Sequence, residues 1–584
     1  MSTTPKAAAT RPNIILITVD ELRFPTTFPE GVHSADEFLA AFMPNLHRLW
    51  ARGVKFTNYY TASAACSPAR GTMATGLYSQ QTFMMCTRAS NRNPQGASQP
   101  QPPLNPDFPT YGKLLRELGY DTPYVGKWHL SNSPPDASSS AAYDYMEPYG
   151  FQGMTMPDPL GLPGHGVGAT PPALPPTGSV APISDAQTAS QAVGWLQARA
   201  ARNSQRPFCL TVGFVNPHDK QFFWGGTEAH QFSAIYEKLG EQPFAPYNTQ
   251  VVEEANPPQL GYGLPANWET SEHLSRTPKL HMVCKELFDY ITGGIWEKSE
   301  FGSEPTPVAG GMHKAVAPKS YWTRALDMYT GVMTDVDTQI GQLVENIPQE
   351  LVANTVIVFT SDHGEYASSH GMQGKGFTVY EEGIRLPLIV VDPSRRFTRD
   401  EASPREQLAS SVDLLPLVVS IGDQGRGWMS SNSDYMQMYG QRANLFGVLS
   451  DAAAPGRDNV VHATDEVIPT TLNYLHAPEH VVGLRNAGGK LGLYRYWKPG
   501  TVDAVTDGQE VEYYDYATAG GRLETEMSPA PPALLKRLVN DIIPNELRAP
   551  LPAAYQEAQA SAAQAYVKYV EAANISTILT AIVD

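Results

Sequence analysis

The sequence predicts an α/β fold in which helices cover both faces of a large, mostly parallel sheet, with a smaller antiparallel sheet near the C-terminus. Apolar runs rich in Ile and Val recur between residues 13 and 391, helical patterns separate them, and the pattern changes after Ser420. Strands that alternate with helices are typical of parallel sheets between helical layers. We therefore expect a first domain over residues 1–425 and a smaller α+β domain with a helical tail over residues 426–584.

Four apolar runs are the expected strands of the large sheet. Each run is continuous rather than alternating, which indicates a strand covered on both faces. The four runs are Asn13–Val19, Pro207–Val215, Thr355–Thr360 and Leu386–Val391.

Two helices are predicted between these runs. Ser184 can cap the first helix, whose apolar stripe extends from Ala189 to Ala200. The second helix covers Trp322–Ile347 and carries apolar residues at the same helical spacing. Both stripes predict helices that pack on the sheet.

Two long segments interrupt this pattern. Residues 131–184 are rich in Pro, Gly and Ser, and residues 221–318 are aromatic, Pro-rich and aperiodic. Long loops in a compact protein commonly border functional sites. The aromatic residues Phe222, Phe223 and Trp224 favour a hydrophobic or aryl substrate group beside such a loop.

The last part of the chain has a different organisation. Ile421–Gly456 is mixed and loop-like, and Pro552–Val583 is Ala-rich and helical. Between them lie three short strand patterns: Val460–Ala463, Lys490–Trp497 and Val511–Tyr516. The final helix ends in an apolar stripe, which predicts either packing on its own domain or a homo-oligomer formed through the C-terminal tail.

Composition narrows the possible partners. The chain has 584 residues, of which 42% are hydrophobic, and a formal net charge of −17. Such an acidic chain argues against nucleic acid or a membrane surface as a partner, and an anionic substrate would need a local cationic pocket. The four cysteines are widely spaced, and no long apolar segment precedes the first strand, so we expect a cytoplasmic protein.

The pentapeptide from Cys66 to Arg70 is the most informative motif. It places a thiol and a fixed cation at the start of a predicted helix, where backbone N–H groups favour an anion. A single free cysteine is more often a small buried apolar residue. The motif therefore indicates a functional site only in combination with the other candidate residues.

Ionisable residues follow the ends of several predicted strands. Ligands bind at the carboxyl ends of strands in open α/β sheets, so these residues are expected to share one edge. Asp20, Asp362 and His363 offer the oxygen and nitrogen ligands that suit a divalent cation. Charge stabilisation and proton transfer need further groups, for which the candidates are Arg70, Lys127, His129, His218 and Lys375.

These segments resemble the type I, formylglycine-dependent sulfatases of the alkaline phosphatase superfamily. The similar segments are C-S-P-A-R from Cys66, G-K-W-H-L from Gly126, F-V-N-P-H from Phe214, S-D-H-G from Ser361 and G-K-G from Gly374. The resemblance extends from Arg11 to about Leu417 and is to the Asp-His branch, which includes arylsulfatases and phosphonate monoester hydrolases. It implies an alkaline-phosphatase-like fold.

The resemblance also implies a site. A formylglycine-generating enzyme would act transiently on Cys66, and the hydrated aldehyde would attack the sulfur of a small-molecule sulfate ester. Asp20, Cys66, Asp362 and His363, with Glu21 directly or through water, would hold one divalent cation, Ca²⁺ rather than Mn²⁺. Arg70 and Lys127 would hold the formylglycine and sulfate oxygens. His218 and Lys375 would assist the leaving oxygen, and His129 would accept the proton that releases sulfate.

The resemblance leaves alternatives for the substrate. The expected activity is hydrolysis of sulfate monoesters, aryl sulfates first. A phosphonate monoester or phosphodiester hydrolase on the same scaffold is the alternative. A non-catalytic protein that binds sulfated molecules is disfavoured, because binding needs neither the thiol nor the proton-transferring histidines.

Overall fold

The computed structural model describes residues 11–88, 101–133, 140–156, 158–159, 184–222, 259–291, 306–308, 312–314, 319–466, 473 and 475–583. Most of the two long segments, including Phe223 and Trp224, lies outside this range. All four cysteines are buried, and none of them forms a disulfide bond. Among the described helices, none combines the length and the apolar character that a membrane crossing requires.

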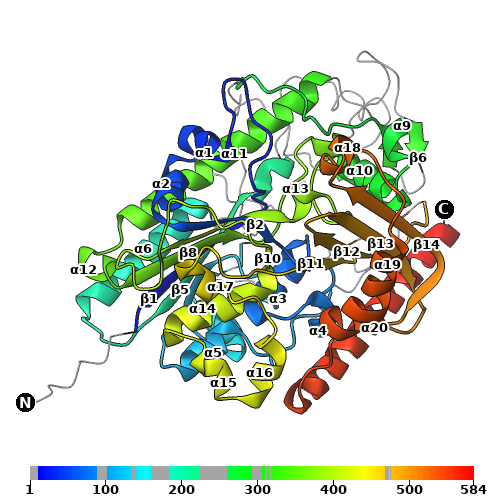
Figure 1. The fold of residues 1–584 in the computed structure, drawn as a ribbon. Coiled ribbons are helices and arrows are strands. Elements are labelled where there is room, and N and C mark those ends of the chain that lie inside the picture. The colour runs from blue at the N-terminus through cyan, green and yellow to red at the C-terminus, as the bar shows by residue number, and fades with distance from the viewer. Residues whose placement is uncertain are drawn as a thin grey trace, which may run out of the picture.

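The large sheet has eight strands within the described residues, in the order β10-β2-β9-β8-β1-β5-β3-β4 (Figure 1). Their bounds are β1 Asn13–Asp20, β2 Val54–Tyr60, β3 Pro123–Gly126, β4 Gln152–Gly153, β5 Cys209–Pro217, β8 Thr355–Ser361, β9 Arg385–Val391 and β10 Ala409–Ser410. All neighbouring pairs are parallel except those of β9, which is antiparallel to both β2 and β8. The four predicted strands are β1, β5, β8 and β9, which confirms the expected α/β sheet.

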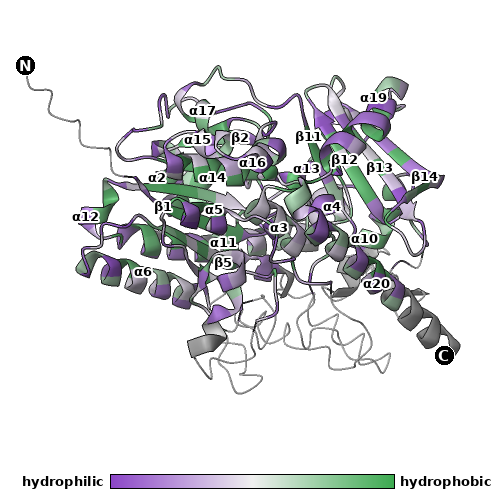
Figure 2. Cartoon of the chain, turned by 90° about the horizontal axis from the view of Figure 1, so that it is seen from below, coloured by the Kyte–Doolittle hydropathy of each residue, from purple (hydrophilic) through white to green (hydrophobic). Residues whose placement is uncertain are grey.

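Side chains of β1 alternate between two cores. Ile14 and Leu16 pack in one apolar cluster, whereas Ile15 and Ile17 pack in another. Such a strand is apolar at every position because both of its faces are covered. Figure 2 shows this strand as a green band between two helical layers.

The helices of the two layers alternate along the chain. Helices α2 (Pro44–Arg52), α6 (Asp185–Ala201) and α11 (Lys319–Glu345) contribute to the Ile15 cluster. Helices α5 (Tyr111–Glu117) and α14 (Leu414–Asp423) contribute to the Ile14 cluster. The predicted cap of α6 is present, because the Ser184 hydroxyl accepts a hydrogen bond from the N–H of Gln187.

The segment between Ile421 and Gly456 differs from the prediction of a loop. It forms the short helices α15 (Gly427–Ser430), α16 (Ser433–Tyr439) and α17 (Leu445–Ser450). Each helix is too short to show a helical period in the sequence. Their apolar residues pack in the same cluster as α14, while the division at residue 425 stays a prediction.

The second sheet is antiparallel, with strands β11 (Asn459–Thr464), β12 (His480–Asn486), β13 (Gly489–Trp497) and β14 (Ala504–Asp515) in that order. The three predicted strands correspond to β11, β13 and β14, whereas β12 was not predicted. Helices α19 (Pro532–Arg537) and α20 (Ala553–Val583) follow, joined by a π-helical segment, Leu538–Leu547. The terminal apolar stripe lies beyond the described side chains, so the proposed oligomer stays a prediction.

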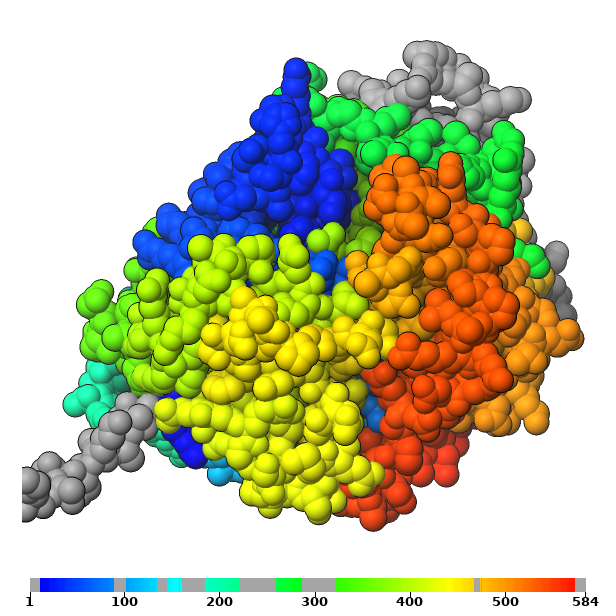
Figure 3. Space-filling view, in the orientation of Figure 1, coloured from blue at the N-terminus to red at the C-terminus, as the bar shows by residue number. Residues whose placement is uncertain are grey.

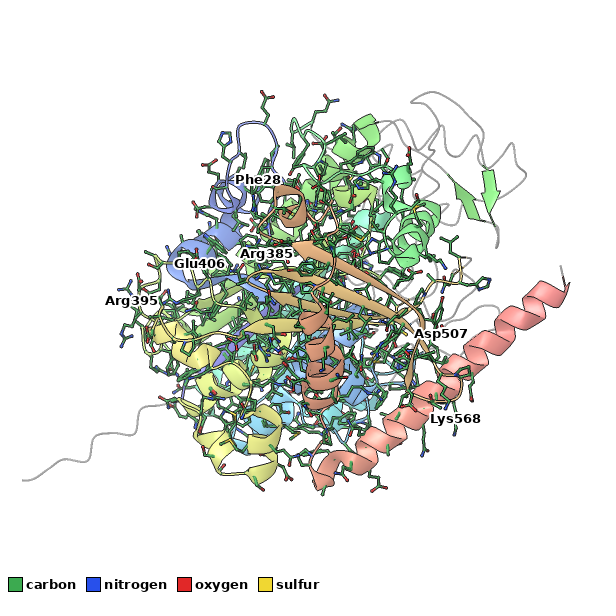
Figure 4. The ribbon with its side chains drawn as sticks, turned by 45° about the vertical axis from the view of Figure 1, so that its right-hand side comes forward. Phe28, Arg385, Arg395, Glu406, Asp507 and Lys568 are labelled. Atoms are coloured by element: carbon green, nitrogen blue, oxygen red, sulfur yellow. The ribbon has the colours of Figure 1, made fainter. Side chains whose placement is uncertain are left out.

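The second sheet packs directly against the part of the chain that forms the large sheet. Ala62 and Val412 share an apolar cluster with residues of β11, β12 and β13. In Figure 3 the C-terminal residues, orange to red, form one mass beside the yellow residues of α14 to α17. Figure 4 shows Asp507 of β14 and Lys568 of α20 on the side of the molecule opposite Arg395 and Glu406.

A substitution at Gly126 tests how closely the end of β3 approaches β5. Gly126 has φ +88°, and a Cβ atom there would lie 2.0 Å from the backbone oxygen of Gly213 in β5. Because the backbone of β5 cannot move aside without breaking its pairing, Gly126→Ala should lower the free energy of unfolding by at least about 3 kcal/mol. The measurement is thermal unfolding.

Gly194→Ala is the matched control. Gly194 lies in α6, and a Cβ atom added there would meet nothing within 4 Å. Alanine favours a helix over glycine, so this variant should gain about 0.5–1 kcal/mol. Equal melting temperatures for the two variants would contradict the close approach of β3 and β5.

Candidate active site

The carboxyl ends of β1 and β8 bring three carboxylates together. Val19 pairs with Ser361, so Asp20 and Glu21 leave one strand beside Asp362 on the next. The N–H of Glu21 donates to Oδ1 of Asp362 at 3.2 Å. All three carboxylates are buried, as the parallel register predicts.

Helix α3 (Cys66–Thr75) begins at this edge. Its first residue, Cys66, places Sγ 3.3 Å from Nε2 of His363 and 3.7 Å from Oδ1 of Asp20. The residue before it, Ala65, offers no side-chain cap. The first turn of α3 therefore presents backbone N–H groups and the Cys66 side chain to the same buried point.

Arg70 lies one turn further along α3 and binds three separate segments. Its Nε contacts Oδ2 of Asp362 at 2.8 Å, and a terminal nitrogen contacts Oδ2 of Asp20 at 3.1 Å. The other terminal nitrogen donates to the backbone oxygen of Lys127 at 2.7 Å. Arg70 is 5% exposed, so its charge is compensated almost entirely by these two aspartates.

Two lysines complete the ring of charges. Nζ of Lys127 lies 2.7 Å from Oδ2 of Asp20, and Nζ of Lys375 lies 2.6 Å from Oε2 of Glu21. The loop of Lys375 is fixed by Glu365, whose Oε1 accepts the N–H of Gly374 at 2.7 Å. The buried cations needed for an anionic substrate are therefore present despite the net negative charge of the chain.

His218 and His129 lie on two further segments of the edge. His218 follows β5, and one of its ring nitrogens lies within 4.8 Å of carboxylate oxygens of Asp20 and Glu21. His129 follows β3 with φ 59°, in the left-handed region. Its backbone oxygen accepts a hydrogen bond from the hydroxyl of Ser67 at 2.8 Å. The structure thus brings all predicted site residues to one edge.

The ring of His129 is held in one orientation. Its Nε2 lies 2.8 Å from the backbone oxygen of Arg88, which can only accept, so Nε2 carries the proton. Nδ1 is buried and has no hydrogen-bond partner among the described residues. The lone pair of Nδ1 is therefore available to accept a proton.

Several supporting residues were not predicted from the sequence. The Asp158 carboxylate accepts the N–H groups of Trp128 and His129 at 2.8 and 2.7 Å, which holds the left-handed turn. Asp185 accepts the N–H groups of Val215 and Asn216 before His218. Isolated aspartates at these distances along the chain give no pattern by which the sequence could have identified them.

Burial and the neighbouring charges shift the pKa values of the site residues. Burial opposes the charge on Asp20, but Lys127 and the other cations hold the pKa of Asp20 well below its ordinary value. Burial raises the pKa of Glu21 well above the ordinary value although Lys375 opposes it. Burial and the nearby lysines lower the pKa of His218 well below its usual range. His218 is therefore neutral at pH 7 in this environment.

The donor set fits a divalent cation. One oxygen of Asp20 and one of Asp362 are bound by Arg70, and the other oxygens face Nε2 of His363 at 3.3 and 3.7 Å. Nδ1 of His363 lies 3.0 Å from the backbone oxygen of Gly364, which leaves Nε2 free to act as a ligand. Together with the Cys66 position, these atoms lie within 4.8 Å of one another, and carboxylates with imidazole suit a hard or borderline cation.

The sequence matches the family model "Sulfatase" over residues 12–423. It is 24% identical to the uncharacterized sulfatase YidJ of Escherichia coli over 399 residues, which cover 65% of this chain and 62% of that protein. It is 25% identical to the choline-sulfatase of Rhizobium meliloti over 397 residues, which cover 66% and 63% of the two chains. The matched part therefore spans less than two thirds of these relatives.

Solved structures share the fold. The phosphonate monoester hydrolase SpPMH from Silicibacter pomeroyi aligns with a TM-score of 0.59 at 19% identity, over 93% of this chain and 97% of that one. BT1596, a 2-O GAG sulfatase, aligns with a TM-score of 0.57 at 17% identity, also over 93% and 97%. Both alignments include the C-terminal region as well as the large sheet.

Removal of a carboxylate tests the cation site. The protein should retain about one divalent cation per chain after dialysis, and Asp362→Asn should lower this occupancy and abolish the stabilisation that added Ca²⁺ gives against heat. Elemental analysis and melting curves with and without chelator measure the two effects. Neither readout requires turnover.

Asp413→Asn is the control for this test. Asp413 is also buried and bound to an arginine, Arg457, but lies outside the site. It should lose stability yet keep the cation. Full occupancy in Asp362→Asn would refute the assigned ligands.

Proposed function

Because the chain belongs to the sulfatase family, we propose that it hydrolyses sulfate monoesters, aryl sulfates among them, with residue 66 as the position of the nucleophile. One observation carries the proposal. Sγ of Cys66 lies 3.3 Å from Nε2 of His363 and 3.7 Å from Oδ1 of Asp20, inside a buried ring that includes Lys127 and Lys375. A buried apolar cysteine would not need such surroundings.

An unmodified thiol in this position has an unusual pKa. Burial and Asp20 oppose its ionisation, yet Lys375 and the other cations hold the pKa of Cys66 well below its usual range. We propose that a formylglycine-generating enzyme catalyses the oxidation of this thiol to formylglycine, as the C-S-P-A-R motif implies. When present, the aldehyde hydrate would supply a hydroxyl nucleophile, and the bound cation would neutralise charge on sulfate oxygens.

The hydrogen bonds of Arg70 argue for a positioning role. Nε and both terminal nitrogens are bound to protein groups. The expectation that Arg70 also holds the formylglycine and sulfate oxygens stays a prediction. In the proposal Arg70 orients Asp20 and Asp362, and the ammonium groups of Lys127 and Lys375 stabilise the anion.

The leaving oxygen is assisted mainly by Lys375. Burial opposes the charge on Lys375, but Cys66, Glu21 and Asp20 hold the pKa of its ammonium group well above the ordinary value. His218 is neutral, so it offers a hydrogen bond rather than a full charge. His129 keeps Nδ1 as a proton acceptor for the step that releases sulfate.

Replacement of the nucleophile gives the first test. Cys66→Ala should lower kcat with nitrophenyl sulfate by at least about a thousandfold and leave the melting temperature nearly unchanged. Cys209→Ala is the matched control, because Cys209 is equally buried in β5 but lies within the apolar core. That variant should lose stability and keep its kcat.

The same assay addresses the alternative substrate class. A phenyl phosphonate ester presents fewer non-bridging oxygens to Lys127 and Lys375 than a sulfate ester does. We expect faster turnover of the sulfate. Higher kcat/KM for the phosphonate would reassign the chain to phosphonate hydrolysis, and activity retained in Cys66→Ala would remove residue 66 from either mechanism.

Leaving-group assistance can be measured with phenyl sulfates of different acidity. Lys375→Ala should lose more activity for phenols of high pKa than for those of low pKa, since good leaving groups need little proton donation. His218→Ala should show a weaker dependence because the imidazole is neutral. The exposed His33→Ala serves as control, and a loss that is the same for every phenol would assign Lys375 to sulfate binding.

A further inference from the structure

Glu466 brings a carboxylate from the C-terminal region to the edge of the active site. It follows β11 directly after Asp465, whose carboxylate is held from three sides. Nδ1 of His480, Nε1 of Trp497 and the hydroxyl of Tyr566 lie 2.7, 2.8 and 2.8 Å from its oxygens. The turn that carries Glu466 is therefore fixed by β12, β13 and α20.

The side chain of Glu466 lies between two active-site segments. Its Oε2 accepts the N–H of Thr87 at 2.8 Å. A Cβ atom added at Gly376 would lie 3.2 Å from Cγ of Glu466, so this side chain covers the residue that follows Lys375. Thr87 in turn precedes Arg88, whose backbone oxygen orients His129.

The second oxygen of Glu466 is available for another group. Within the described part of the chain, Oε1 has no hydrogen-bond partner, and the residue is only partly buried. Burial raises the pKa of Glu466 to about 7, and Cys66 and Lys375 are near enough for their charges to act on it as well. Glu466 thus places an oxygen without a partner among the described residues beside Gly376, the residue that follows Lys375.

A carboxylate in this position repels an anionic substrate. Lys375 already pairs with Glu21, and it favours the charged form of Glu466 less than burial opposes it. A hydrogen-bond donor on the substrate would remove the conflict, because a carboxylate is a strong acceptor. The donor would have to lie beside the oxygen that Lys375 assists.

We propose that Glu466 accepts a hydrogen bond from a hydroxyl group next to the scissile oxygen, so that the preferred substrates are sulfate esters with a neighbouring hydroxyl. Catechol sulfates and sugar sulfates share this chemistry. The inference rests on the proposed function for the position of the sulfate, and it adds a specificity-determining residue from the C-terminal region. Among aryl sulfates, the inference selects those that carry a hydroxyl group next to the sulfate ester.

Binding to a protein that cannot turn over its ligand tests the inference. In the Cys66→Ala background with Ca²⁺ present, calorimetry would compare nitrocatechol sulfate, which has the neighbouring hydroxyl, with nitrophenyl sulfate, which lacks it. We expect about tenfold tighter binding of the catechol ester. Glu466→Gln should remove this preference, and it should bind nitrophenyl sulfate at least as tightly as the parent because the repelling charge is gone.

Glu479→Gln is the matched control. Glu479 precedes β12, and burial raises its pKa to about 7 as well. This variant should retain the preference. A hexose sulfated beside a free hydroxyl, compared with its deoxy analogue, distinguishes a sugar source from a catechol source.

Three results would overturn the inference. The first is that the parent binds both members of each pair with equal affinity, and the second is that Glu466→Gln loses the same affinity for both. The third is that Glu466→Gln loses affinity only for choline sulfate. Choline sulfate carries a positive charge but no donor, so the last result would assign Glu466 to charge pairing. The preference is measured without turnover. It therefore stands or fails separately from the formylglycine chemistry, which the activity of Cys66→Ala tests.

Discussion

The buried guanidinium of Arg70 is the interaction on which the site depends. It joins α3 to the ends of β1 and β8 through Asp20 and Asp362, and to the end of β3 through the backbone oxygen of Lys127. A buried charge is tolerated only when it is paired and hydrogen-bonded. Because each aspartate gives one oxygen to Arg70, the other oxygen is directed towards residue 66 and His363. One side chain thereby fixes four segments and sets the orientation of the cation ligands.

The C-terminal region is joined to the region of the large sheet at two places. Arg457, just before β11, binds Asp413 beside α14, and Asp465 anchors the turn that carries Glu466. Glu466 then reaches Thr87 and covers Gly376. The large sheet thus supplies the groups proposed for chemistry, while the second sheet supplies a group proposed for selection of the leaving alcohol. Such a division places reactivity on rigid strands and specificity on a separate element.

The sequence predicted the central strands and the residues at their ends, because strands covered on both faces are apolar throughout and end abruptly in polar residues. It could not predict Asp158, which holds His129 by backbone contacts made only in the folded chain. Glu466 was missed for the same reason, since its partners are distant in the chain. The segment that forms helices α15 to α17 was interpreted as a loop because each helix is shorter than two or three turns. Strand β12 was missed because polar residues flank it.

The central claim is that residue 66 is an aldehyde at the centre of these charges. The most direct measurement is the mass of the tryptic peptide Phe56–Arg70 from protein made in cells that contain the formylglycine-generating enzyme. The account predicts a peptide in which an aldehyde replaces the CH₂SH group, in proportion to sulfatase activity across preparations. Full activity in protein that carries only the unmodified thiol would contradict it.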